Sequence, residues 1–365
     1  EENALIQSGS SAGFGIRLAY DTSANRVFVL EAFEAGTAFQ AGMDRGTELL
    51  TIGGQSVASL MSSGGPQAVI NALGPSDPGV ARSFTFRTRE GTERNANITK
   101  TEFSLDPISD RYGVKVLNDG TGPVGYINLR TFIVEDAGPQ LRTAFQQFRQ
   151  QGITKVILDL RYNGGGLVSV AELLGDLMAA DKSGQVFSKT VLRPSKSSEN
   201  EIDRFASQPQ AIAATKIAVI GRGGTASASE LVTNSFIPYL GDNLALVGTN
   251  TFGKPVGQFA FDRSACDDRL RAVAFKTTNA NDQGEYFTGL ASVVRRTCAA
   301  SDGIFEQLGD PAEASVKAAL DFLGGRTCTP ISSGGDQTVQ SAGGRQQLLQ
   351  PNIPSPAQRE VPGLF

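Results

Sequence analysis

The feature that most constrains the fold is a regular alternation of strand-like and helix-like segments between residues 122 and 239. Apolar runs rich in β-branched residues predict strands, and apolar residues at helical spacing predict helices. The predicted strands are 122–130, 155–160 and 216–220, and the predicted helices are 137–151, 167–180 and 227–239. This order predicts an α/β domain of βαβ units around a largely parallel sheet.

A different pattern precedes this α/β domain. Short β-type runs broken by Gly-rich turns occur at residues 14–20, 26–33, 48–52 and 83–89, with a helical stretch at 66–73. A chain of 365 residues is long enough for two domains. We predict an unstructured lead at 1–12, a mainly β domain at 13–103, the α/β domain at 104–325 and a Gly/Ser/Gln/Pro-rich tail at 326–365, which has too little apolar surface to fold alone.

The composition limits the chemistry, because the sequence contains no histidine. Ser-His-Asp and Cys-His mechanisms are excluded, and so are the common His-containing metal sites. The three cysteines, Cys266, Cys298 and Cys328, are too few and too widely spaced for a metal cluster, and we expect no metal or cofactor. They fit one disulfide, with Cys266–Cys298 preferred, or three free buried thiols. A net charge of −4 argues against nucleic acid as a partner.

A triple glycine follows the predicted strand at 155–160. The sequence RYNGGGL covers residues 161–167 and leads into the next predicted helix. Glycines let the backbone approach a ligand closely, and amides at the start of a helix can stabilise an oxyanion. The same turn suits a phosphate, but neither a dinucleotide-binding fingerprint nor a P-loop pattern is present. Nucleotide binding is therefore the weaker interpretation.

A second small-residue turn, with the sequence GGTASASE at residues 223–230, follows the strand at 216–220. Ser227 at a helix start has an accessible hydroxyl and nearby amide donors, although an ordinary helix N-cap explains the same pattern. Without histidine, the candidate base is a lysine whose charged form is disfavoured by burial. We expect Lys254 in an apolar pocket walled by Phe252, Pro255 and Val256. The alternative is a lysine exposed at the surface.

These two segments resemble the carboxyl-terminal processing, or tail-specific, proteases, a family with a crotonase/ClpP-like catalytic fold behind a PDZ domain. Further similarity occurs at residues 125–129 and 285–288, so the resemblance spans roughly residues 10–325. It implies that Ser227 rather than Ser229 is the nucleophile and that Lys254 is the general base. It also implies that Gln258 positions the lysine.

The resemblance further implies that Gly165 or Gly166, together with the Ala228 amide, forms the oxyanion hole. The sequence departs from the family pattern in several places, including the stretch 289–308. Pro255 replaces the glycine after the lysine, Gly164 replaces a proline, and two extra residues lie between the serine and the lysine. We place this insertion near residues 238–243, where a longer helix-to-strand loop would leave the site intact.

The first domain resembles a PDZ domain. Gly13, Phe14, Gly15 and Ile16 begin a strand, and their backbone amides can form a nest for a carboxylate. The segment 34–55 continues the pattern, except that Thr47 replaces the usual aspartate. The resemblance implies that an extended peptide adds to this sheet edge with its terminal carboxylate on residues 13–16.

The predicted function is that of a serine endopeptidase that recognises protein substrates through their C-termini. The alternatives are a non-catalytic protein that binds apolar ligands or peptide tails on the same fold, and a PDZ scaffold. Expected partners are protein or peptide substrates, an adaptor protein and a second copy bound through the tail. Phe365 in this tail would enter the PDZ groove or the active site of its own or of a neighbouring molecule. The start at Glu1 and the resemblance predict an exported, periplasmic or cell-envelope protein with no membrane span in this chain.

Overall fold

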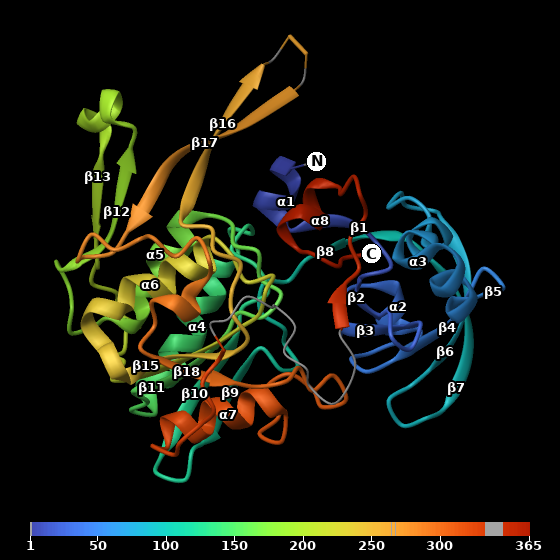
Figure 1. The fold of residues 1–365 in the computed structure, drawn as a ribbon, viewed down its shortest axis with the longest axis horizontal. Helices are drawn as coiled ribbons and strands as arrows, with labels where there is room; N and C mark the ends of the chain where they lie inside the picture. The colour runs from blue at the N-terminus through green and yellow to red at the C-terminus, as the bar shows by residue number, and fades with distance from the viewer. Residues whose placement is uncertain (1, 264, 267, 333–345) are drawn as a thin grey trace.

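The computed structural model describes residues 2–263, 265–266, 268–332 and 346–365. Within this part of the chain, a mainly β domain and an α/β domain lie beside each other (Figure 1). The fold class inferred from the alternation of segments is confirmed. The two βαβ units at the centre of the α/β domain have the predicted order, and their element bounds agree with the prediction within two residues.

The α/β domain is built on a six-stranded sheet with the order β18-β15-β14-β11-β10-β9, in which only β9 is antiparallel to its neighbour. Alternate strand residues enter two separate hydrophobic clusters, one covered by three helices and the other by α7. The sheet is therefore buried on both faces, as parallel sheets require. Its elements are β9 (Val114–Asn118), β10 (Pro123–Asn128), α4 (Ala137–Gln150), β11 (Lys155–Asp159), α5 (Val168–Met178), β14 (Lys216–Gly221), α6 (Ala228–Leu240), η2 (Gly241–Asn243), β15 (Leu244–Gly248), η3 (Leu290–Ser292), β18 (Arg296–Ala299) and α7 (Ala314–Leu323).

The first domain is an antiparallel sheet with the order β19-β2-β3-β4-β6-β7, and β5 pairs with β4. Its elements are β2 (Ile16–Asp21), β3 (Arg26–Ala32), α2 (Thr37–Gln40), β4 (Glu48–Ile52), β5 (Gln55–Ser56), α3 (Val57–Leu73), β6 (Ala81–Arg87) and β7 (Glu93–Thr99). Helix α3 begins earlier than the sequence predicted and kinks at Gly65, where φ is 63°. Pro66 explains this kink, because a proline restricts the residue before it to non-helical conformations. The prediction at 66–73 therefore found only the second half of the helix.

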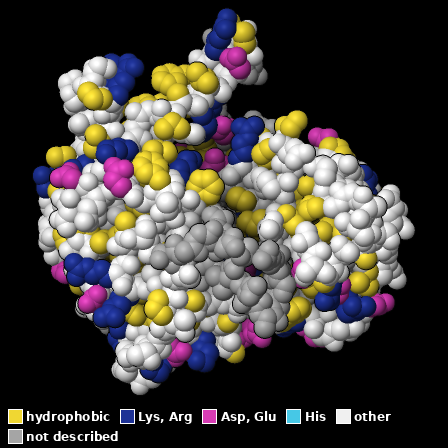
Figure 2. Space-filling view, viewed as in Figure 1, with side chains coloured by type: hydrophobic (Ala, Val, Ile, Leu, Met, Phe, Trp, Pro, Cys, Tyr) yellow, Lys and Arg dark blue, Asp and Glu magenta, His cyan; other side chains and the backbone are white. Residues whose placement is uncertain are grey.

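An arm of two β-hairpins projects from the α/β domain (Figure 1). It contains β12 (Val186–Leu192), η1 (Pro194–Glu199), β13 (Glu201–Arg204), β16 (Val256–Arg263) and β17 (Asp268–Thr278), in the order β13-β12-β17-β16. Hydrophobic side chains are visible on its surface in Figure 2. The exposed apolar residues of the arm are Ile202, Phe259, Phe261, Leu270 and Val273.

Both ends of the chain are more ordered than the sequence predicted. Residues expected to form an unstructured lead make α1 (Glu2–Ser8) and β1 (Ser10–Gly13), which pairs with β8 (Thr101–Ser104). Leu5 anchors α1, because it is buried in a cluster with Phe103 and Leu105. The tail contains β19 (Gln346–Leu348) and α8 (Pro356–Glu360), both packed on the folded domains, whereas residues 333–345 lie outside the described part.

The cysteine pairing differs from the preferred prediction. Cys298 forms a disulfide with Cys328, and their Cα atoms are 5.3 Å apart. Cys266 is a free, exposed thiol in the connection between β16 and β17. The prediction of Cys266–Cys298 was wrong because the arm carries Cys266 away from the sheet. Among the described helices, none has both the length and the apolar character needed to cross a membrane.

Candidate active site

Ser227 occupies the turn between β14 and α6 in a conformation that is unusual for a side chain of any size. It is the N-cap residue of α6, with φ 56° and ψ −115°. Positive φ at a non-glycine residue costs about 1–3 kcal/mol and tends to persist at functional sites. Ser229, the neighbouring serine, is buried, and its hydroxyl donates to the Asn163 carbonyl at 3.1 Å. The strained and partly exposed Ser227 is therefore the better nucleophile of the two.

The glycine turn after β11 packs directly against Ser227. A Cβ atom on Gly165 would lie 2.8 Å from the Ser227 Cβ, and one on Gly166 would lie 2.3 Å from the backbone nitrogen of Ile133. Both residues have positive φ, 109° and 139°, so they must be glycine on two grounds. These glycines thus bring the glycine turn close enough to the Ser227 turn for one ligand to contact both.

The amides of these turns have different partners. The Gly165 N–H donates to Asn163 Oδ1 at 2.9 Å, which fixes the turn. Within the described residues, the N–H groups of Gly166 and Ala228 have no hydrogen-bond acceptor. Ala228 is the first residue of α6, where backbone N–H groups lack intrahelical partners. Gly166 and Ala228 are therefore the amides available to a ligand.

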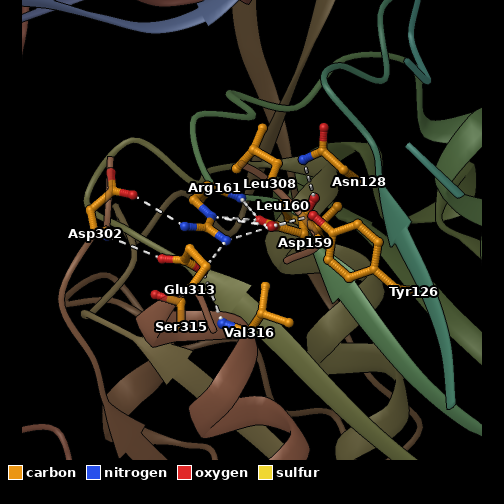
Figure 3. A network of polar contacts seen from close by, with 12 residues as sticks. Tyr126, Asn128, Asp159, Leu160, Arg161, Asp302, Leu308, Glu313, Ser315 and Val316 are labelled. Atoms are coloured by element: carbon orange, nitrogen blue, oxygen red, sulfur yellow. Dashed lines mark hydrogen bonds and ion pairs between the residues drawn. The ribbon is translucent and has the colours of Figure 1, made fainter. Parts of the chain in front are cut away.

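A buried ionic network forms around Arg161, three residues before the glycine turn (Figure 3). Arg161 donates to Asp159 at 2.7 Å, to Glu313 at 2.9 Å and to Asp302 at 3.1 Å. Burial alone would lower the pKa of Arg161, but the surrounding carboxylates outweigh it and hold the pKa well above its ordinary value. The residue therefore stays charged, and it ties β11 to the segment that leads into α7.

A second network joins this one to the first domain. Arg45 donates to Asp302 at 2.8 Å and to the Tyr162 hydroxyl at 3.1 Å. Tyr162 lies two residues before the triple glycine and has φ 65°. On the other side of the interface, Glu31 of β3 accepts from Arg130 at 2.6 Å. The two domains are thus joined by buried ion pairs beside the glycine turn.

Glu230 connects the serine turn to the lysine loop, a role that the sequence analysis missed. Its Oε2 atom accepts from the backbone amides of Ser227 at 3.1 Å and Lys254 at 2.7 Å. Its Oε1 atom accepts from Thr251 Oγ1 at 2.6 Å and the Gly253 amide at 2.7 Å. Burial raises the pKa of Glu230, and these donors act in the opposite direction. Glutamate three residues after a helix-starting serine is the capping-box signal, which was available in the sequence.

The lysine loop agrees with the prediction only in part. Lys254 is partly buried, and its backbone shares the Glu230 Oε2 acceptor with Ser227, so the two backbones lie close together. Pro255 is buried, but Phe252 is 59% exposed and does not form a closed wall. Gln258 is exposed on β16, and no hydrogen bond from its side chain to Lys254 occurs among the described residues.

The departures from the family pattern lie outside the serine turn. Residues 238–243, where we placed the two-residue insertion, form the end of α6 and the short helix η2. Ser227 precedes the other end of α6, a helix of 13 residues and therefore about 20 Å long. Gly164, in place of a proline, packs against the C-terminal segment, since a Cβ atom there would lie 3.3 Å from the Glu360 carbonyl oxygen.

The predicted peptide site of the first domain lies at the edge of β2. The Phe14 and Gly15 carbonyls accept from Ala38 and Phe33 within the domain, at 3.0 and 2.9 Å. Gly15 has φ 75°, and a Cβ atom there would lie 2.5 Å from the Gly36 Cα. The Ile16 amide donates to the backbone oxygen of Phe365 at 3.1 Å. A segment of the chain itself therefore lies at the position predicted for a peptide.

The site thus combines a strained serine at a helix start with a glycine turn at the end of parallel strands, an arrangement that resembles the nucleophile turn of serine hydrolases. Residues 123–287 match the sequence model of a protein family described as Peptidase family S41. The carboxyl-terminal-processing protease of Synechocystis sp. is 26% identical over 329 residues, which cover 88% of this chain and 70% of that protein. The chloroplastic C-terminal processing peptidase of Tetradesmus obliquus is 29% identical, over 70% of this chain and 54% of that one.

A solved structure supports the fold independently. The putative S41 protease from Bacteroides fragilis superimposes with a TM-score of 0.68 at 21% identity, over 87% of this chain and 86% of that one. The chain therefore shares the fold of that protein, and residues 123–287 are similar to Peptidase family S41. The chain spans only about half of the length of the Tetradesmus relative.

Proposed function

We propose that the protein is a serine endopeptidase in which Ser227 is the nucleophile and Lys254 the general base. The observation that carries this proposal is the shared Glu230 carboxylate. It fixes the strained serine turn and the lysine loop to one another in a chain that has no histidine. The relatives are named as proteases, which does not favour a purely binding role on the same fold.

The reaction uses the two turns in sequence. Ser227 Oγ attacks the peptide carbonyl while Lys254 Nζ takes the hydroxyl proton. The Gly166 and Ala228 amides donate to the oxyanion of the tetrahedral intermediate, and the fixed Gly165 amide holds their geometry. Lys254 then returns the proton to the leaving amine. A water molecule, deprotonated by the same lysine, hydrolyses the acyl-enzyme and frees Ser227.

Substrates are proposed to bind through their C-terminal residues at the edge of β2. Strand addition supplies affinity from backbone hydrogen bonds, and residues 13–16 supply the amides nearest to the end of the bound peptide. Support comes from the strand-like contact that Phe365 makes there, with its amide 2.8 Å from the Ile16 carbonyl oxygen. Gln258 is assigned to orienting Lys254 when substrate is bound.

We also propose that the protein works in an oxidising compartment outside the cytoplasm. The Cys298–Cys328 disulfide supports this, because such bonds persist mainly in exported proteins. Cell fractionation of the native host, followed by alkylation of free thiols, tests the assignment. A cytoplasmic protein with three alkylated cysteines would contradict it.

Cleavage of unfolded casein tests the activity. The parent chain should release fragments. Ser227→Ala and Lys254→Ala should release none, while Lys115→Ala, a change at a distant lysine, should match the parent. Cleavage that persists in Ser227→Ala would reject the assignment of the nucleophile.

A further inference from the structure

The C-terminal segment, residues 346–365, occupies the whole free edge of β2. Strand β19 pairs antiparallel with β2, and the Leu349 amide continues this ladder to the Leu18 carbonyl at 2.9 Å. After an excursion through α8, the chain returns to the same edge. There the Leu18 amide donates to the Gly363 carbonyl at 2.8 Å, and Phe365 exchanges two hydrogen bonds with Ile16. The segment thus pairs with the strand as an added peptide would.

The side chains of the segment are also buried in the folded domains, in addition to its backbone pairing. Phe365 is 2% exposed and belongs to the core cluster of the first domain, which includes Phe14 and Met43. Val361 and Leu364 are buried in a second cluster that also contains Ile133 of the α/β domain. A segment held by buried apolar side chains and by backbone pairing is a specific fit rather than a loose surface contact.

The excursion between the two paired parts has a defined structure of its own. Ser355 and Gln358 form a capping box at the start of α8. The Gln358 amide group donates to the Leu364 carbonyl at 2.8 Å, and the Gln350 side chain accepts from the Gly363 amide at 3.0 Å. These bonds fix where α8 lies relative to the groove.

The end of helix α8 lies against the glycine turn. The Glu360 carbonyl oxygen and the Pro362 ring are the nearest atoms to a Cβ placed on Gly164, at 3.3 and 3.6 Å. The segment therefore extends from the peptide groove to the glycine turn. In Figure 1 it is the red part of the chain between the two domains.

We propose that residues 346–365 are an internal ligand that keeps the peptidase covered until a substrate tail displaces them from the β2 edge. This inference rests on the proposed function and describes how that peptidase activity is regulated. The contacts at β2 are backbone bonds that any extended peptide can replace, so the covered state is reversible. A covalently joined segment acts at a high effective concentration, and a free peptide must compete with it. The apparent affinity for a free peptide is then its intrinsic affinity multiplied by the fraction of molecules whose groove is open.

Peptide binding tests the covered groove without requiring catalysis. In a Ser227→Ala background, a labelled peptide with the sequence VPGLF, that of residues 361–365, is titrated against Phe365→Asp and against Ile353→Asp. Ile353 belongs to the same segment but is 88% exposed, so its variant is the matched control. We expect at least about tenfold tighter binding to Phe365→Asp. Phe365→Ala, a milder change, should lie between the two. Equal affinities in correctly folded variants would overturn the internal ligand.

Activity supplies the second readout. With Ser227 intact, Phe365→Asp should cleave casein at least about fivefold faster than Ile353→Asp at low substrate concentration. A slower Phe365→Asp enzyme would overturn the proposal and make the segment a support of the site. If no variant cleaves but the binding difference holds, the peptidase assignment fails and the covered groove stands. If specific activity rises on about a hundredfold dilution, the segment comes from a second copy and the internal assignment is wrong.

Discussion

The turn that carries Ser227 and the C-terminal segment 346–365 are held in opposite ways. The serine turn is fixed by a buried carboxylate and by the glycine turn packed against it, and three residues before that glycine turn Arg161 contacts three acids. Residues 346–365 are held mainly by backbone pairing at a sheet edge and by a few apolar side chains. Buried polar bonds are costly to break, whereas edge pairing can be exchanged for that of another peptide.

The two kinds of contact suit two different roles, which are catalysis and the control of access to the site. A catalytic serine must already be in position when the carbonyl arrives, which favours a site that does not reorganise. A cover must leave on demand, which favours contacts that a substrate can imitate. The following predictions test each side of this comparison, beginning with the largest expected effect.

The two serines of the SAS sequence should respond oppositely to removal of the hydroxyl. Ser227→Ala should lower kcat by at least about a thousandfold with little change in thermal stability. Ser229→Ala should keep most of the activity but lose about 1 kcal/mol of stability, because its hydroxyl satisfies the buried Asn163 carbonyl. Casein cleavage and thermal unfolding of both variants measure this. Equal losses of activity would remove the distinction between them.

The interface should lose stability in acid. Arg130 and Arg17 outweigh the effect of burial and lower the pKa of Glu31 from 4.5 to about 2. Because the pKa is lower in the folded state, the stabilisation is complete above about pH 4.5 and is lost as the pH falls through about 2. Its size is about 3 kcal/mol. Urea unfolding across this range should show the loss in the parent, while Glu31→Gln should be less stable above about pH 4.5 and should show a flatter curve that approaches the parent at the acid end. An exposed control, Glu102→Gln, should follow the parent curve.

Glu230→Gln tests the clamp between the serine turn and the lysine loop. The amide group of glutamine would face backbone N–H donors that the carboxylate now satisfies, so we expect a loss of about 2 kcal/mol in stability. Misplacement of the two turns should also lower kcat by about ten- to a hundredfold. An unchanged kcat in a destabilised protein would reduce Glu230 to a structural residue.

The exposed arm should be the most tolerant region. Phe261→Ser and Leu270→Ser alter side chains on the outer hairpin that are largely exposed. We expect changes in stability within about 0.5 kcal/mol and unchanged cleavage of casein. A large loss of activity without a loss of stability would instead show that the arm contacts substrate.

The sequence predicted the catalytic domain well because its elements are local and strongly periodic. Strands such as β11 are continuous apolar runs, and α4 has apolar residues at helical spacing, so each was recognisable alone. The glycines beside Ser227 were also identifiable, because close backbone approach leaves a compositional signal.

The features that the sequence did not predict depend on contacts between distant parts of the chain. Helix α1 and the segment 346–365 have weak local signals and become ordered by docking, through Leu5 in one case and Phe365 in the other. The pairing of Cys298 with Cys328 depended on where the arm carries Cys266. Glu230 was overlooked because its capping-box spacing suggested only a helix start, and its bonds to the lysine loop are tertiary.

The central claim, that Ser227 is activated by Lys254, is tested most directly by a serine-reactive fluorophosphonate followed by peptide mass spectrometry. The account predicts a single adduct, on Ser227, that is absent from Ser227→Ala and strongly reduced in Lys254→Ala. An adduct on Ser229, or labelling of Ser227 that is unaffected by removal of the lysine, would contradict it.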